Sequence, residues 1–232
     1  MTSKNTMIIE NAIKYVHEIF ARDFSGHDFY HTMRVYKTAV QIAVRENADI
    51  LTVQLAALLH DVDDIKLSPT TYSVKKNAVD FMKQNKLSDE IINSVCKIIE
   101  EVSFAGTDSV VPSSIEGKCV QDADRLDAIG AVGIARAFAY GGNKGRKMYD
   151  PDIKPMTNMN KEQYRQNDNS TTINHFYEKL LLLKDMMNTE TAKKLQNAAM
   201  LLCKHTLMNF WQNGTTKSYK YQNTLKKFLH PL

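Results

Sequence analysis

The sequence has few of the residues that interrupt or cross-link a chain. Its 232 residues include 9 glycines, 5 prolines and 3 cysteines. So little glycine and proline, beside abundant leucine, alanine, lysine and glutamate, predicts helices rather than a sheet. Cys96, Cys119 and Cys203 stand far apart, which argues against a disulfide framework and against a zinc knuckle. This use of cysteine favours a reducing cytoplasm.

Long hydrophobic runs and a strong charge of one sign are also missing. No apolar run reaches the roughly 20 residues that a membrane-spanning helix needs, and residues 1–6 lack the apolar core of a secretory signal. We therefore expect a cytoplasmic protein without a membrane partner. The net charge is only +4, with much of the excess in residues 215–232. A nucleic-acid partner is not expected, because its binding would favour a basic stripe with aromatics through the folded body.

Apolar residues recur at helical spacing through most of the chain. Helices are predicted over residues 5–22, 28–47, 48–62, 73–84, 90–102, 115–140 with a break near Gly130, 171–187 and 189–213. We expect an all-α, single-domain helical bundle over residues 1–213, followed by a lysine-rich helix or tail over 214–232. Residues 141–170 have no helical period, and we expect them to form a long glycine-rich lid loop.

Several potential metal ligands stand where their predicted helices are otherwise apolar. His31 lies on the second predicted helix, His60 and Asp61 end the third, and Asp122 or Asp124 follows on a later one. Two imidazoles with two carboxylates suit Mn²⁺, Fe²⁺ or Mg²⁺ better than a structural zinc. A metal ion lowers the pKa of its bound water, so this set favours a hydrolase. Alternatively, the acidic cluster at the end of the third predicted helix is simply hydrated and binds no metal.

The order of these residues resembles the HD superfamily of metal-dependent phosphohydrolases. Residues 26–35, with the sequence GHDFYHTMRV, resemble its histidine helix, Leu-Leu-His-Asp at 58–61 matches the doublet that names it, and Ala-Asp-Arg-Leu at 123–126 matches its closing aspartate. Residues 122–146 are also similar to the bacterial YpgQ/YedJ-type subgroup. The resemblance implies a bundle of HD-domain type with Asp122 beside the ligands. The implied ligands are His31, His60, Asp61 and Asp124.

The resemblance further implies hydrolysis of nucleotide phosphate bonds, most simply of a nucleoside triphosphate to a monophosphate and pyrophosphate. One divalent ion is expected, Mn²⁺ first, with Mg²⁺, Co²⁺, Fe²⁺ and Ni²⁺ as alternatives. Asp64 is expected to activate water or protonate the leaving group, and Lys66 to neutralise phosphate charge. The partner is then a nucleotide or another phosphorylated small molecule. The expected substrate contacts are His27, Arg34, Lys144, Arg146, Lys147, His175 and Lys179.

Other interpretations stay open at this point. The same metal site would serve a phosphomonoesterase or a cyclic phosphodiesterase, and a nucleotide-sensing module would bind without turnover. Arg34 could instead form a structural ion pair with Asp61 or Asp124, and Lys66 could be an exposed loop lysine. Asp63 is expected to be solvated. The oligomeric state is open, with a homodimer as one option.

Overall fold

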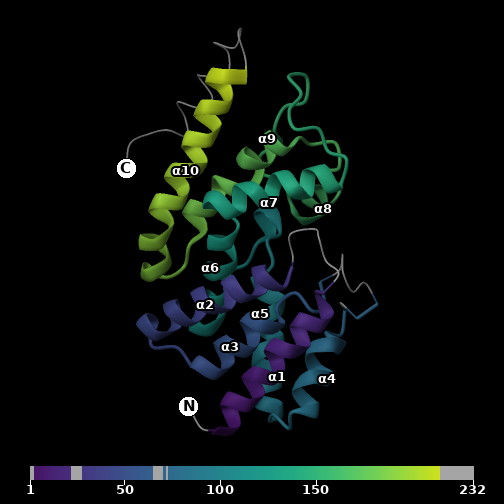
Figure 1. The fold of residues 1–232 in the computed structure, drawn as a ribbon, viewed down its shortest axis with the longest axis vertical. Coiled ribbons are helices and arrows are strands. Elements are labelled where there is room, and N and C mark those ends of the chain that lie inside the picture. The colour runs from purple at the N-terminus through teal and green to yellow at the C-terminus, as the bar shows by residue number, and fades with distance from the viewer. Residues whose placement is uncertain (1–2, 22–27, 65–69, 72, 215–232) are drawn as a thin grey trace.

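The computed structural model describes residues 3–21, 28–64, 70–71 and 73–214, and every regular element in them is a helix. Helices α1 to α5 occupy one half of an elongated molecule and α7 to α10 the other, with α6 between them (Figure 1). The elements are α1 (Ser3–Ile19), α2 (Phe29–Glu46), α3 (Ile50–Leu59), α4 (Lys76–Gln84), α5 (Asp89–Val102), η1 (Gly106–Asp108), α6 (Ile115–Asp127), α7 (Gly130–Asn143), α8 (Lys161–Arg165), α9 (Thr172–His175), η2 (Phe176–Leu180), η3 (Leu182–Met186) and α10 (Glu190–Gly214). The predicted all-α fold is confirmed.

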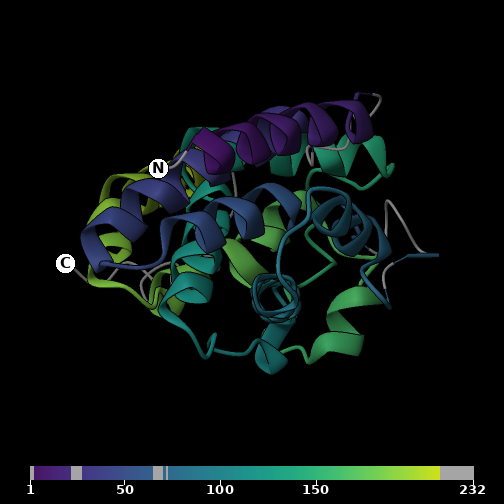
Figure 2. The same cartoon turned by 90° about the horizontal axis from the view of Figure 1, so that it is seen from below.

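Helix α3 forms the centre of the first half. Residues 52–59 are all buried, and the helix contacts α1, α2, α5 and α6. A helix that is apolar on every side is stable only when neighbours surround it. Figure 2, seen from this end, shows α1 along the outside of the bundle. Because α3 is enclosed, the polar residues that follow it at its C-terminal end lie inside the molecule.

Short polar side chains fix where the helices near this point begin. The carboxylate of Asp28 accepts a hydrogen bond from the His31 N–H at 2.7 Å, and that of Asp49 accepts one from Thr52 at 2.8 Å. Such caps satisfy first-turn N–H groups that have no partner within the helix. The predicted cap at Asp28 is therefore confirmed, and it sets the orientation of α2 and of its histidine.

The second half departs from the predicted boundaries. The break near Gly130 is confirmed, since Gly130 begins α7 with a φ of +72°. However, α7 continues to Asn143 and α8 lies within the predicted lid, so residues 141–170 are not one continuous loop. Gly141 is required inside α7, because a Cβ there would lie 2.3 Å from Thr172 Oγ1. The predicted helix 171–187 is divided into α9, the π-helical turn η2 and the 3₁₀ turn η3.

The described part of the chain contains no helix that is both long and apolar enough to span a membrane. Its three cysteines are all free, as predicted. The predicted lysine-rich helix or tail beyond Gly214 lies outside the described residues.

Candidate metal centre

Four predicted ligands meet where the first turn of α2, the end of α3 and the last turn of α6 come together. Nε2 of His31 lies 3.4 Å from Asp61 Oδ2 and 3.5 Å from Asp124 Oδ1. Nε2 of His60 lies 3.3 Å from the same Asp61 oxygen. One ligand atom each of His31, His60 and Asp124 lies within 4.8 Å of the other two. Two imidazole nitrogens and one Asp124 oxygen therefore form a compact group, and the Asp61 carboxylate lies against both imidazoles.

The chemistry of this cluster fits a divalent cation. Nδ1 of His60 lies 2.8 Å from the Ala57 carbonyl oxygen, so in the neutral imidazole Nδ1–H donates and Nε2 carries the lone pair. That Nε2 is buried and has no hydrogen-bond partner within the described chain. A buried polar atom left in this way is costly unless a ligand satisfies it. Mixed nitrogen and oxygen donors suit Mn²⁺, Fe²⁺ or a similar ion.

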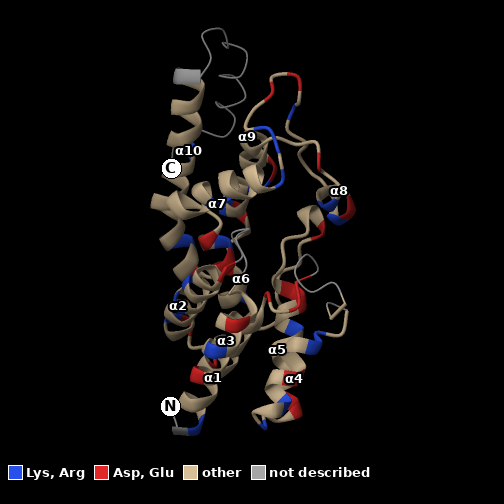
Figure 3. Ribbon diagram, turned by 45° about the vertical axis from the view of Figure 1, so that its right-hand side comes forward, with Lys and Arg blue, Asp and Glu red and all other residues tan. Residues whose placement is uncertain are grey.

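A third carboxylate, that of Asp127, contacts His31 on the other side of the imidazole ring. Its Oδ2 lies 2.7 Å from His31 Nδ1, and its Oδ1 accepts a 2.6 Å hydrogen bond from Arg34 Nε. Arg136 adds another bond of 2.6 Å to Oδ2. A carboxylate behind a histidine ligand fixes the ring and its tautomer, so that Nε2 faces the cluster. Figure 3 shows acidic and basic positions side by side near the α6–α7 junction.

Asp127 was missed at the level of sequence. The available signal was its position three residues after Asp124, on the same face of a helix. The structure also corrects the expected partner of Arg34. This guanidinium pairs with Asp127, at Nε and at a second nitrogen 3.1 Å from Oδ2, rather than with Asp61 or Asp124.

The charges of the centre reinforce one another. Burial lowers the pKa of His60, but the charges of Asp61 and Asp124 and the hydrogen bonds to Asp61 and Ala57 together raise this pKa to about 9. Burial likewise opposes the charged form of His31, and hydrogen bonds to Asp127 and Asp61 still raise its pKa. Burial would raise the pKa of Asp127, whereas hydrogen bonds from His31 and Arg34 hold it well below its usual value. Both imidazoles therefore lie where neighbouring carboxylates favour a positive charge.

Asp122 does not lie beside these ligands, contrary to the prediction. It is fully buried, and its carboxylate accepts hydrogen bonds from the backbone N–H of Asn188 at 2.9 Å and of Thr189 at 2.7 Å. The Thr189 hydroxyl donates a third bond at 2.8 Å. Asp122 therefore anchors the chain that leads into α10, because its side chain leaves α6 on a different face from that of Asp124.

The expectation that Asp63 is solvated is wrong. Only 3% of this residue is exposed, and its carboxylate accepts hydrogen bonds from the N–H groups of Asn77 at 3.1 Å and Ala78 at 2.9 Å. These N–H groups belong to the first turn of α4, where a negative charge is favourable. Asp63 therefore connects the turn after His60 to α4.

The predicted catalytic and phosphate-binding residues are only partly gathered at the cluster. Asp64 is half-buried directly after the turn, with its N–H bonded to the Asp61 carbonyl at 3.0 Å. Lys179 lies on η2, where burial lowers its pKa while the charges of Asp124 and Asp61 oppose this shift. His175 is half-buried at the end of α9. As predicted, the neighbouring apolar positions of this segment are buried in the core.

The lid cations make contacts of their own. Lys144 is exposed at the end of α7, with Nζ 5.9 Å from the Tyr140 ring centre. Arg146 donates a 3.4 Å hydrogen bond to the Asn167 carbonyl, and Lys147 pairs with Asp150 at 2.6 Å. In the described structure, none of the three forms an ion pair with the four candidate ligands. His27 and Lys66 lie outside the described residues.

A helical bundle that gathers two histidines and two aspartates at one junction defines a class of metal-dependent hydrolases. The HD domain model matches residues 28–129, which include all four candidate ligands. The protein YpgQ of Bacillus subtilis is 42% identical over 183 residues, covering 78% of this chain and 81% of that protein. Protein L803 of Acanthamoeba polyphaga mimivirus is 30% identical over 197 residues, covering 71% and 80%. The chain therefore belongs to the HD superfamily.

Solved structures agree with this assignment. A protein from Lactobacillus plantarum has a TM-score of 0.83 at 36% identity, covering 94% of this chain and 100% of that one. An HD-superfamily hydrolase from Bacillus thuringiensis has a TM-score of 0.70 at 39% identity, covering 92% and 100%. YpgQ crystallised in complex with ADP has a TM-score of 0.69 at 36% identity, covering 88% and 97%. The chain is accordingly an HD-superfamily hydrolase.

Proposed function

We propose that this chain is a nucleotide pyrophosphohydrolase, which splits a nucleoside or deoxynucleoside triphosphate into the monophosphate and pyrophosphate. The convergence of His31, His60, Asp61 and Asp124 carries the proposal, because this donor set suits a hydrolytic metal. The crystal structure of the relative YpgQ with ADP supports a nucleotide as the substrate. The resemblance of residues 122–146 to the YpgQ/YedJ-type subgroup supports cleavage that releases pyrophosphate.

The four residues would hold one divalent cation, which we propose to be Mn²⁺. Such an ion supplies positive charge that polarises a phosphoryl oxygen and lowers the pKa of a nearby water. The protein contributes the orientation of its ligands. His60 is fixed through Nδ1 by the Ala57 carbonyl, and His31 is fixed by Asp127, so both Nε2 atoms point to the same place.

The remaining residues would move a proton and neutralise charge. Water attacks the α-phosphorus: a bond forms from the water oxygen, and the bond from this phosphorus to the oxygen bridging to the β-phosphate breaks. We assign Asp64 as the base that takes the proton of the attacking water, since it directly follows the ligand turn and is half-buried. Lys179, on η2, interacts with Asp124 and Asp61 and would offset phosphate charge.

The test is a screen of nucleotides against the purified protein with Mn²⁺, Mg²⁺ or Co²⁺, in which pyrophosphate and inorganic phosphate are measured separately. Pyrophosphate and a monophosphate in equal amounts are the expected products. Phosphate released from a monophosphate would replace the proposal with a phosphomonoesterase, and opening of a cyclic nucleotide would replace it with a phosphodiesterase. Tight nucleotide binding by the metal-loaded protein without turnover would indicate a sensing module.

The metal site is tested directly by His60→Ala. This change removes the buried Nε2 ligand, so metal content by elemental analysis and activity should both be lost while the helical circular dichroism is kept. His205→Ala is the matched control, because His205 is exposed on α10. Unchanged metal content in the His60 variant would falsify the ligand assignment.

A further inference from the structure

The described structure contains a cavity outside the cluster of candidate ligands, none of which lines it. It is a cavity of about 180 Å³, lined by residues of the loop after α5, of η1, of α8 and of the η2–η3 segment. Its walls include the aromatic rings of Phe104 and Tyr164 and the side chains of Met159, Met186 and Glu178. Pockets for whole drug-sized ligands measure roughly 300–1,000 Å³, so this cavity suits a single ring system.

The walls of the cavity are held together by specific contacts. The Thr107 N–H donates to the Met159 carbonyl at 2.8 Å, which joins η1 to the segment before α8. Gly106 permits this approach, since its φ is +61° and a Cβ would lie 2.0 Å from the same carbonyl oxygen. Phe104 and Tyr164 meet edge to face, with ring centres 5.0 Å apart. The cavity is therefore formed before any ligand binds.

Glu178 is the one acidic residue among those that line the cavity. Only 5% of this residue is exposed, and its carboxylate accepts hydrogen bonds from the Ser170 hydroxyl at 2.7 Å and the Met156 N–H at 3.1 Å. Both donors are neutral, and no ion pair to Glu178 occurs in the part of the chain that is described. A carboxylate has about four acceptor positions, so it can accept further N–H donors from a ligand.

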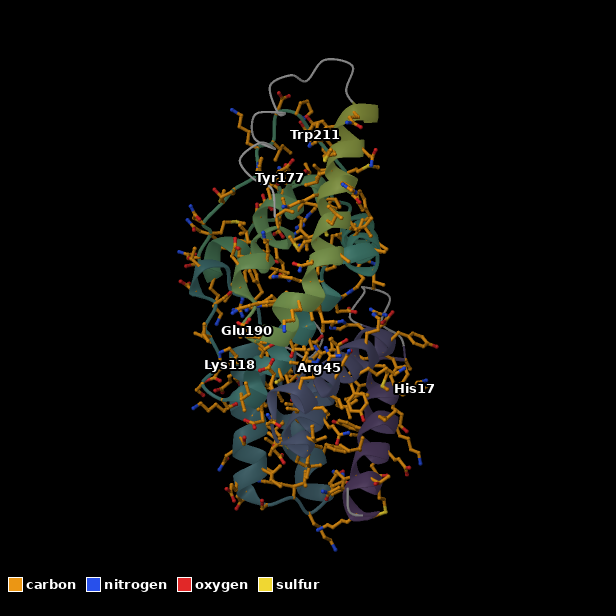
Figure 4. The ribbon with its side chains drawn as sticks, turned by 90° about the vertical axis from the view of Figure 1, so that its left-hand side faces the viewer. His17, Arg45, Lys118, Tyr177, Glu190 and Trp211 are labelled. Carbon is orange, nitrogen blue, oxygen red and sulfur yellow. The ribbon has the colours of Figure 1, made fainter. Side chains whose placement is uncertain are left out.

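A hydrogen bond from α10 holds the π-helical turn that carries Glu178. Trp211 of α10 donates a 3.0 Å hydrogen bond from Nε1 to the Tyr177 hydroxyl, and both side chains are buried. Figure 4 shows them in the same upper region of the molecule. Because Tyr177 and Glu178 are consecutive, this contact limits the movement of the cavity wall.

Two residues connect the cavity to the metal centre. Nζ of Lys179 lies 5.1 Å from the centre of the Phe104 ring, and the charge of this lysine interacts with Asp124 and Asp61. Arg125, directly after Asp124, is buried and donates a hydrogen bond to the Met186 carbonyl. If a nucleotide places its phosphates near Lys179, its base can therefore reach the cavity.

We propose that this cavity binds the nucleobase of the nucleotide substrate, with Phe104 and Tyr164 contacting the ring and Glu178 accepting hydrogen bonds from its N–H groups. The inference rests on the proposed function, since it assigns the base to one side of the same site. A phosphate is disfavoured here by the Glu178 carboxylate. Aromatic walls suit a base because every base has a π-face, and adenine, guanine and cytosine each offer an amino group to a carboxylate.

The experiment measures binding to the metal-loaded protein by calorimetry, with AMP, GMP and CMP as probes and inorganic tripolyphosphate as the probe without a base. Phe104→Leu keeps an apolar wall but removes the aromatic ring. We expect this change to lower the affinity for the three monophosphates about tenfold, which is the order of one lost base stack. Glu178→Gln should also lower the affinity for the monophosphates, because it replaces an acceptor oxygen with an N–H donor. Tripolyphosphate affinity should stay unchanged in both variants.

Glu10→Gln, at an exposed position of α1, is the matched control for Glu178→Gln. If Phe104→Leu lowers the thermal midpoint severely, Tyr164→Leu tests the adjoining aromatic wall. Equal losses for tripolyphosphate and monophosphates, or no loss for either, would overturn the proposal. Turnover separates the two hypotheses: pyrophosphate release with unchanged KM in the variants rejects only the base cavity, whereas base-dependent binding without turnover rejects only the proposed function.

Discussion

Nδ1 of His31 lies 2.7 Å from Oδ2 of Asp127, on the side of the imidazole that faces away from the metal cluster. The same carboxylate receives Arg34 and Arg136, so its position is fixed by two cations on different helices. The contact decides which nitrogen of His31 can face a metal, because Nδ1–H must donate to the carboxylate. Asp127 is thus a positioning residue of the candidate centre.

Asp127→Asn should therefore weaken metal binding without removing a ligand. Loss of such a carboxylate typically lowers metal affinity about 10–100-fold. The affinity is measured by titrating the metal-free protein with Mn²⁺ in a calorimeter, and Co²⁺ absorption reports the ligand geometry. Asp89→Asn, at an exposed position of α5, is the control. Wild-type Mn²⁺ affinity with an unaltered Co²⁺ spectrum would show that Asp127 does not position the ligand.

Asp122 and Asp124 should have separable roles. Asp122→Ala removes a buried acceptor of several hydrogen bonds at the start of α10, so we expect unfolding to become easier by about 1–3 kcal/mol. Metal affinity should change little. Asp124→Ala should show the reverse pattern, with metal affinity lost and stability nearly kept. Denaturant unfolding and metal titration of both variants provide the measurement, and loss of metal in the Asp122 variant would contradict the assignment.

The metal-free protein should lose stability as the pH rises above neutrality. The pKa of His60 is raised to about 9 in the folded state, above the value of about 6.5 expected when unfolded. Its contribution is fully present below pH 6.5 and disappears as the pH rises through 9. Added Mn²⁺ should reverse this trend, because it binds the neutral imidazole. Thermal unfolding at several pH values, with chelator or with Mn²⁺, tests this prediction. In the presence of chelator, the thermal midpoint of His60→Gln should depend less on pH than that of the wild type.

The lid cations should matter for polyphosphate substrates. Lys144 is exposed and the Arg146 guanidinium makes one long hydrogen bond, so both could turn toward a phosphate. We expect Lys144→Ala combined with Arg146→Ala to raise KM for triphosphates more than KM for small phosphate esters. Lys154→Ala, at another exposed position of the same segment, is the control. An equal rise in KM for both kinds of substrate would exclude a phosphate clamp.

Much of the fold follows from local properties of the sequence. Apolar spacing located the helices, Asp28 marked the beginning of α2, and Gly130 marked the break before α7. The η2 turn could not be predicted in this way, because a π-helical turn is sustained by its packing rather than by propensity. The extension of α7 through Gly141 also depends on a distant partner, Thr172, which requires a residue without a side chain.

By itself, the sequence determined the helical class, and it placed His31, His60-Asp61 and Asp124 on three separate helices. Only the tertiary structure decided which faces of those helices meet. Asp122 and Asp124 are two residues apart, so at 3.6 residues per turn they leave α6 in nearly opposite directions. Spacing along a helix fixes that angle but carries no information about the neighbour on each side. For this reason Asp124 faces the histidines and Asp122 the start of α10.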